Sequence, residues 1–354
     1  MVKVFILGAS GFIGCEFSSC ELILFLLSVI SNLLLLVAVA LALRRNGHRV
    51  YGLVRSPAKG LDLAKNEITP VIGDIFQPSS WTSVIESEGI DVIIDSSRVH
   101  QNVSKVLTEA KRLGEARLKG LKRGPKLGFV LFSGSWVHGD QPDARDIVNE
   151  LTAPTPLEMV AWRPAVENEL LSFSDVLDTV VIRPTMVYGG SGSLLSMVLA
   201  PIAAAVKRGA SEAKVLGRRF EFAAIHKDDV ADFTLKVVEK VGNSCFIFIF
   251  SILEVSLLTM QISYVGALSY PVFDITAQHE SYTDIIEAAA KHMGFTGAII
   301  YRNPEGLMAS LEQAILTQFN TSSDRARTYL GWEPKHRDIM GQIDVYTAAM
   351  VANQ

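Results

Sequence analysis

Three glycines near the amino end have the spacing of a phosphate-binding turn. The stretch VKVFILGASGFIG begins at Val2, and its glycines follow the pattern GxxGxxG. Such a turn brings the backbone close to a diphosphate, and the amino end of the following helix attracts the phosphate charge. The continuous apolar run before the turn is typical of a buried parallel strand. This arrangement predicts that a nucleotide contacts Gly8, Ser10, Gly11, Phe12, Ile13 and Gly14.

Two basic residues follow the second strand-like segment, HRVYGLVRS. Arg55 lies at its end and Lys59 comes shortly after. An acidic residue at this point would bind the 2′-hydroxyl of NAD, whereas a basic residue suits the 2′-phosphate of NADP. We therefore expect NADP, with NAD as the alternative, although a solvated basic loop would have the same composition.

Apolar strand-like segments alternate with stretches of helical length over the first half of the chain. After the first strand they occupy residues 48–56, 68–74, 91–97, 126–139 and 178–190. This alternation predicts an α/β protein with a Rossmann-like, doubly wound parallel sheet and right-handed crossovers. Ligands of such sheets bind at the carboxyl ends of the strands.

Six short motifs occur in a characteristic order: GASGFIG at 8–14, GD at 73–74, SGSWVHG at 133–139, RPTMVYG at 183–189, IHKDDVA at 225–231 and YLGWEP at 329–334. Together they resemble the extended short-chain dehydrogenase/reductase family, in its NAD-dependent epimerase/dehydratase-like branch. The resemblance implies a dinucleotide-binding core over residues 1–190. It also implies a small C-terminal substrate lobe over residues 191–354 that completes the core. In that family, the positions of Asp74, Ser96 and Ser97 lie beside the adenine and the ribose–nicotinamide part of the cofactor.

The resemblance also says where catalytic residues belong. Family enzymes use a Ser or Thr after the fifth strand and a Tyr-x-x-x-Lys pair on the next helix, where the lysine lowers the pKa of the tyrosine. Ser133 and Ser135 are candidates for the hydroxyl. The usual pair is missing, because residues 52–187 contain no tyrosine and residues 127–206 no lysine.

Other side chains stand near the missing pair. Trp162 or Arg163 lies nearest the tyrosine position, and Val166 or Glu167 nearest the lysine position. Arg163 can hold a phosphate or carboxylate and can pair with Glu167 one turn on, although an ordinary surface salt bridge would look the same. His138 is a candidate acid/base because imidazole titrates near neutrality, the alternative being a packed histidine.

Two functions remain open. The first is an NADP-linked oxidoreductase or epimerase that acts on a small organic substrate with non-standard acid/base residues. The second is a non-catalytic dinucleotide-binding or sensor protein of the same fold. A fold resemblance supports the cofactor more securely than the reaction.

Composition excludes some partners. The net charge of −4 does not suggest a nucleic acid. The three cysteines, Cys15, Cys20 and Cys245, lie in or beside two apolar blocks, so we expect neither a disulfide framework nor a metal cluster. This usage fits a reducing compartment, and we expect a cytoplasmic protein. A homodimer is left open by the sequence.

The two apolar blocks, residues 15–36 and 243–263, each interrupt a family element at a single point. The uncharged run Leu22–Leu43 is long enough to span a bilayer, which takes about 20 residues. A helix in lipid cannot also cover the sheet, however, and we interpret both blocks as translated introns. A genuine insertion and a membrane anchor are the alternatives, and membrane association follows only if the blocks are genuine.

Overall fold

The computed structural model describes residues 1–8, 35–97, 103–120, 125–141, 146–190, 193–217, 220–242 and 271–352. Of the predicted phosphate-binding turn, only Gly8 lies in this part of the chain. The predictions for Ser10, Gly11, Phe12, Ile13 and Gly14 fall outside the described residues, as does the second apolar block and most of the first.

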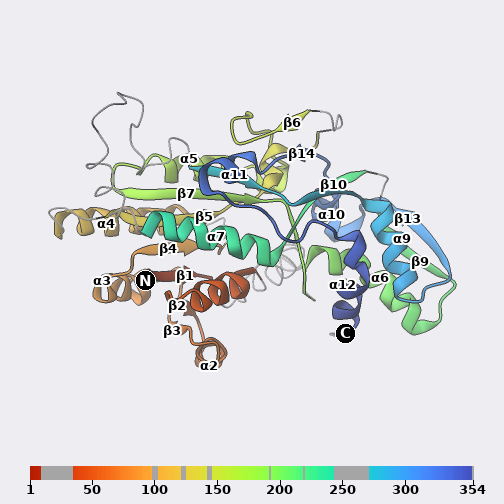
Figure 1. Cartoon of the computed structure of the whole chain (residues 1–354), viewed down its shortest axis with the longest axis horizontal. Helices are drawn as coiled ribbons and strands as arrows, with labels where there is room; N and C mark the ends of the chain where they lie inside the picture. Colours follow the sequence, from red (N-terminus) through yellow and green to blue (C-terminus); the bar gives the residue numbers. More distant parts are fainter. Residues whose placement is uncertain are drawn as a thin grey trace.

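A parallel sheet of seven strands forms the centre of the molecule (Figure 1). Its order is β11-β7-β5-β4-β1-β2-β3. The strands are β1 Lys3–Leu7, β2 Arg49–Val54, β3 Thr69–Ile72, β4 Val92–Asp95, β5 Leu127–Phe132, β7 Leu177–Pro184 and β11 Val272–Ile275. The direction of winding reverses between β1 and β4, which is where ligands bind in sheets of this type. The predicted doubly wound, Rossmann-like sheet is confirmed.

Helices cover both faces of this sheet because alternate residues of each strand point to opposite sides. Val4 and Ile6 belong to a core shared with helical residues 35–45, and with α7 Lys227–Gly242 and α11 Asp324–Leu330. Phe5 and Leu7 belong to the opposite core. The helices on that second face are α3 Ser79–Glu88, α4 Val103–Gly120 and α5 Arg163–Leu171, while α2 Pro57–Ala64 lies at the β3 edge.

Helical residues 35–45 include the last two residues of the first apolar block. Leu35 and Leu36 are buried in the core, together with Val39 and Leu43. Within the described part of the chain, every helix is too short or too polar to cross a bilayer.

A second hydrophobic core lies beside the sheet and forms a smaller lobe (Figure 1). Its helices are α6 Leu194–Arg208, α9 Tyr282–His292, α10 Ala309–Ile315 and α12 Ile343–Val351. Its strands are β8 Met186–Tyr188, β9 Glu212–Leu216, β10 Glu221–His226, β12 Gln278–Ser281 and β13 Ala298–Arg302, and β6 Ile147–Val148 pairs with β14 Asn320–Thr321. Short 3-10 turns complete the chain: η2 Ser135–His138, η3 Glu158–Val160, η4 Gly306–Met308 and η5 Met340–Gln342.

Segments from the second half of the chain return to the main sheet. The strand β11 pairs with β7, and Trp332, fully buried, packs in the core under α7. Trp332 and Phe233 of α7 meet edge to face, with ring centroids 5.3 Å apart. Residues before and after the expected boundary at residue 190 therefore pack together in the core of the main sheet.

Candidate functional site

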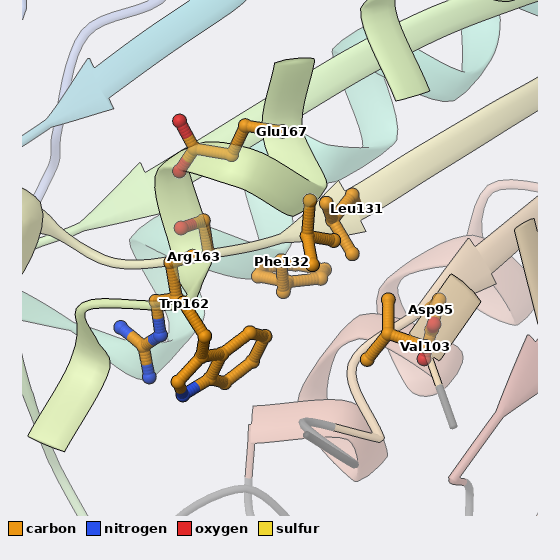
Figure 2. Close-up of a pocket in the computed structure, with 9 residues that line it drawn as sticks. Asp95, Val103, Leu131, Phe132, Trp162, Arg163 and Glu167 are labelled. Atoms are coloured by element: carbon orange, nitrogen blue, oxygen red, sulfur yellow. The ribbon is translucent and has the colours of Figure 1, made fainter. Parts of the chain in front are cut away.

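A pocket opens at the carboxyl ends of β4 and β5, between the starts of α4 and α5. It encloses about 280 Å³, counting the space open to solvent. Figure 2 shows Trp162 and Arg163 on one side, Asp95 and Val103 on the other, with Phe132 between them. The complete lining is Asp95, Val103, Leu131, Phe132, Ser133, Trp162, Arg163, Val166 and Glu167.

The end of β1 approaches the end of β4 closely beside this pocket. Gly8 has φ +88°, and a Cβ placed on it would lie 3.2 Å from the Cα of Ser97. Only glycine fits both the backbone angle and the space. The predicted turn thus begins where two neighbouring strands leave room for nothing larger.

Unpaired hydroxyl groups lie at the same edge of the sheet. The Oγ atoms of Ser96 and Ser133 are buried and have no hydrogen-bond partner among the described residues, whereas the Ser97 side chain lies at the Asp95 carboxyl group. Buried hydroxyls normally have a partner, so those of Ser96 and Ser133 indicate a polar ligand. The sequence predicted Ser96 and Ser97 as cofactor contacts and Ser133 as a catalytic hydroxyl, and the structure places all three at neighbouring strand ends.

Asp95 brings a carboxyl group into the pocket. Its side chain is buried, and burial raises its pKa, while the side chain of Ser97 and the N–H of Ser97, which donates to Oδ1 at 2.8 Å, work in the opposite direction. A carboxyl group in this state can hold a proton at a higher pH than a solvated one. The sequence put Asp95, with Ser96 and Ser97, at the strand end where the resembling family approaches the ribose and nicotinamide of its cofactor.

Arg163 lies against the backbone that connects Ser133 to Ser135. A Cβ on Gly134 would lie 2.6 Å from Nη1 of Arg163, so the glycine makes room for the guanidinium. The guanidinium carbon lies 5.7 Å from the ring centre of Trp162. Arg163 is buried and is the first residue of α5. Ser133 and Arg163, two of the predicted catalytic residues, therefore line the same pocket.

Glu167 forms a buried ion pair with Arg183 of β7. The Nε atom of Arg183 donates to Oε1 at 3.2 Å and Oε2 at 3.1 Å, and Nη2 donates to Oε2. Both side chains are almost fully covered. The sequence offered Arg163 as the partner of Glu167. The structure instead joins α5 to β7, two elements whose contact no local spacing reveals.

Ser135 and His138 are not among the residues that line the pocket. Ser135 donates to the carbonyl of Pro184 at 3.2 Å. Nε2 of His138 lies 2.9 Å from Oδ2 of Asp274, and both side chains are completely buried. The backbone N–H of Asp274 in turn donates to Oε1 of Glu150, whose pKa is raised by burial and by the Asp274 charge. His138 therefore belongs to a network that ties η2 to β11.

The predicted adenosine-side residues follow β2 and β3. Arg55 comes directly after β2, and the backbone N–H of Lys59 donates to the capping Ser56 at 3.4 Å in the first turn of α2. Asp74 follows β3, and its Oδ1 accepts from the N–H of Phe76 at 2.9 Å. All three stand on the β1 side of the point where the winding reverses.

Comparison with known proteins decides the family. A model of the NAD-dependent epimerase/dehydratase family matches residues 37–245, which is more than half of the chain. The chain belongs to this family. No curated protein sequence matches it.

Solved structures of epimerases and dehydratases share the fold. The dTDP-glucose 4,6-dehydratase of Bacillus anthracis, solved with NAD, has a TM-score of 0.66 at 12% identity, covering 100% of this chain and 98% of its own. The UDP-glucuronic acid 4-epimerase of Bacillus cereus, with UDP-glucuronic acid and NAD, has 0.65 at 16%, covering 100% of both. The UDP-glucose 4-epimerase of Thermotoga maritima, with UDP-glucose, has 0.65 at 15%, covering 99% of both.

As a member of the NAD-dependent epimerase/dehydratase family, the chain retains features that fit a dinucleotide. The close approach at Gly8 and the unpaired hydroxyls of Ser96 and Ser133 lie at the carboxyl ends of neighbouring strands. What differs from the usual family pattern is α5, where the sequence RPAVENELL has neither a phenol nor an amine.

Proposed function

We propose that this epimerase/dehydratase family member binds a nicotinamide dinucleotide and an anionic small molecule without the usual tyrosine–lysine proton transfer. On this proposal the protein has the fold of the family's enzymes but acts as a dinucleotide-binding or sensor protein. The observation that carries this proposal is the buried ion pair between Glu167 and Arg183, beside Arg163 in the pocket.

The side chains near the missing pair cannot supply its chemistry. An arginine guanidinium remains protonated at any working pH, so Arg163 neither takes nor gives a proton. Glu167 accepts three hydrogen bonds from Arg183 and has no positive charge with which to lower the pKa of a neighbouring group. His138, with its Nε2 held by Asp274, is sealed from solvent.

Arg163 is suited instead to hold a negatively charged group. The guanidinium presents planar, paired donors that match a carboxylate or a phosphate. Gly134 gives it space against the backbone, and Trp162 adds an aromatic face for a flat ligand. These features support a small organic anion, bound beside the nicotinamide end of the cofactor.

We further propose NADP as the cofactor, with NAD as the alternative. The basic residues Arg55 and Lys59 support the 2′-phosphate, whereas the family description and the solved relatives name NAD. A bound dinucleotide would supply the capacity to accept or donate a hydride. Gly8, Ser96 and Ser97 would hold and orient it at the strand ends. We also propose a cytoplasmic location, on the basis of the cysteine usage.

A second candidate is an NADP-linked oxidoreductase or epimerase with a non-standard acid. Asp95 favours it, because its buried carboxyl group lines the pocket, its pKa is raised, and a hydroxyl group, Ser133, lines the same pocket. In this reading Asp95 gives or takes the proton and Ser133 orients the substrate oxygen.

Fluorescence titration of the full-length chain with NADPH and NADH, followed by a turnover assay, separates the candidates. Tight NADPH binding with no oxidation across a panel of carbonyl compounds and nucleotide sugars supports the binding protein. Turnover that disappears in Asp95→Asn but persists in Asp62→Asn, an exposed control, supports the enzyme. Failure to bind either nucleotide overturns both.

A further inference from the structure

The candidate pocket contains a hydroxyl group that lacks a hydrogen-bond partner. Ser133 lines the pocket, its side chain is buried, and its Oγ has no partner among the described residues. A buried hydroxyl group in this state costs free energy, because it has lost its water and gained nothing in exchange. The pocket therefore suits a ligand that places an oxygen atom against Ser133.

The guanidinium of Arg163 lies one residue away from this hydroxyl group. A Cβ on Gly134, which directly follows Ser133, would lie 2.6 Å from Nη1 of Arg163. Consecutive Cα atoms are only about 3.8 Å apart. A small molecule with two polar groups on neighbouring carbon atoms can therefore reach both side chains.

The charges around the pocket favour a ligand with one negative charge. Arg163 is the basic member of the lining, whereas Asp95 and Glu167 are acidic, and the charge of Glu167 is offset by Arg183. Figure 2 shows Arg163 beside Trp162, across the pocket from Asp95. A carboxylate on the Arg163 side has a cationic partner there. The second charge of a phosphate would instead have Asp95 and Glu167 as its neighbours.

The remaining lining is apolar and the pocket is small. Val103, Leu131, Phe132 and Val166 contribute hydrocarbon surface, and the volume of about 280 Å³ includes space open to solvent. Pockets for drug-sized ligands usually enclose about 300–1,000 Å³. A sugar would place several hydroxyl groups against these apolar side chains without hydrogen bonds, which is unfavourable. A short hydrocarbon chain fits the same surface.

We propose that this pocket binds a small 2-oxo monocarboxylic acid with an apolar side chain. Arg163 pairs with the carboxylate, because its planar donors match the two carboxylate oxygens. Ser133 donates its hydroxyl hydrogen to the neighbouring 2-oxo oxygen, which supplies the partner that it lacks. The apolar lining packs against the side chain of the acid. This inference names the ligand of the proposed dinucleotide-binding protein, and it rests on that proposed function.

The test is calorimetric titration of the full-length chain saturated with NADP⁺, which cannot reduce the ligand. Three probes differ in one group each: 4-methyl-2-oxopentanoate, 4-methylpentanoate without the oxo group, and 4-methylpentan-2-one without the carboxylate. We expect the oxo acid to bind about tenfold more tightly than either of the others, because each lacks one partner of the site.

Two variants assign the two groups. Ser133→Ala should bind 4-methyl-2-oxopentanoate no better than 4-methylpentanoate, while its affinity for 4-methylpentanoate stays that of the wild type. Arg163→Gln should bind the oxo acid no better than the ketone. The matched controls are Ser87→Ala on α3 and Arg112→Gln on α4, both exposed, which should keep the wild-type preferences. Circular dichroism checks that each variant folds.

The inference is overturned if the wild type shows no preference for the oxo acid over 4-methylpentanoate, or if Ser133→Ala retains that preference. Tighter binding of inorganic phosphate than of the oxo acid also overturns it. These failures are separate from failure of the proposed function. A chain that binds NADP⁺ and 4-methylpentanoate without preferring the oxo acid keeps the proposed function and loses only this ligand class. A chain that binds no dinucleotide loses both.

Discussion

Glu167 on α5 and Arg183 on β7 form a buried ion pair beside the candidate pocket. Removal of one partner from such a pair leaves an uncompensated buried charge, which is strongly unfavourable. The pair therefore holds α5 against the sheet, at the point where the resembling family has a lysine near its cofactor. Where the resembling family has a single positive charge, this chain has an ion pair with no net charge.

Breaking the pair should destabilise the protein. We expect Glu167→Gln, which strands the Arg183 charge, to lower the free energy of unfolding by about 3–5 kcal/mol, measured by urea denaturation. The control is Asp62→Asn, which removes the exposed pair with Lys65 and should cost less than about 1 kcal/mol. Equal losses of unfolding free energy in the two variants would mean that the buried pair stabilises the fold no more than the exposed pair does.

Gly134 should control the position of Arg163. In Gly134→Ala the new Cβ would collide with Nη1, and the flexible guanidinium would move away. We expect stability to change by less than about 1–2 kcal/mol, because only a side-chain end must shift. Binding of a small organic anion to the dinucleotide-loaded protein should weaken about tenfold. Gly120→Ala, where a Cβ meets nothing, is the control, and identical anion binding in both variants would exclude this role for Arg163.

The basic residues after β2 should decide between the two dinucleotides. We expect the double variant Arg55→Ala/Lys59→Ala to bind NADPH about tenfold more weakly, because a partner of the 2′-phosphate is lost. NADH affinity should stay the same. Fluorescence titration measures both. If wild-type affinities for NADPH and NADH are equal and the double variant changes neither, the NADP proposal is wrong.

His226, whose ring stacks on that of His336, should make the free energy of unfolding depend on pH. The pKa of His226 is lowered from 6.5 to about 4 in the folded chain, so the unfolded chain binds the proton first as the pH falls. The stability that the neutral His226 ring contributes to the folded chain is therefore fully present above pH 6.5, and it is lost progressively as the pH falls to about 4. We expect a loss of about 3–4 kcal/mol over this window, because the pKa falls by about 2.5 units and each unit corresponds to about 1.4 kcal/mol. Urea denaturation at several pH values measures it, and His226→Asn should flatten the slope.

The match to the family model begins at residue 37, directly after the first apolar block, and ends at residue 245, near the start of the second. Translated introns remain our prediction for both blocks. We expect transcript reads across codons 14–37 to show a splice gap. Continuous coverage of these codons would instead support a genuine insertion.

The sequence by itself determined the sheet and its winding. The apolar runs at residues 4–7 and 92–94 are continuous because both faces of the sheet are covered, and this pattern is local in the chain. The missing Tyr-x-x-x-Lys pair was also evident, because a residue's absence needs no coordinates. The family resemblance singled out Ser133 after the fifth strand and Arg163 near the position of the missing tyrosine.

Only the tertiary structure decided which charges meet. Glu167 and Arg183 are 16 residues apart, His138 and Asp274 are 136 apart, and His226 and His336 come together across the fold. Such partners depend on how separate elements pack, and packing is a property of the whole core rather than of any local spacing. The burial of His138 against Asp274 could not be predicted for the same reason, since the sequence gives no measure of what covers a side chain.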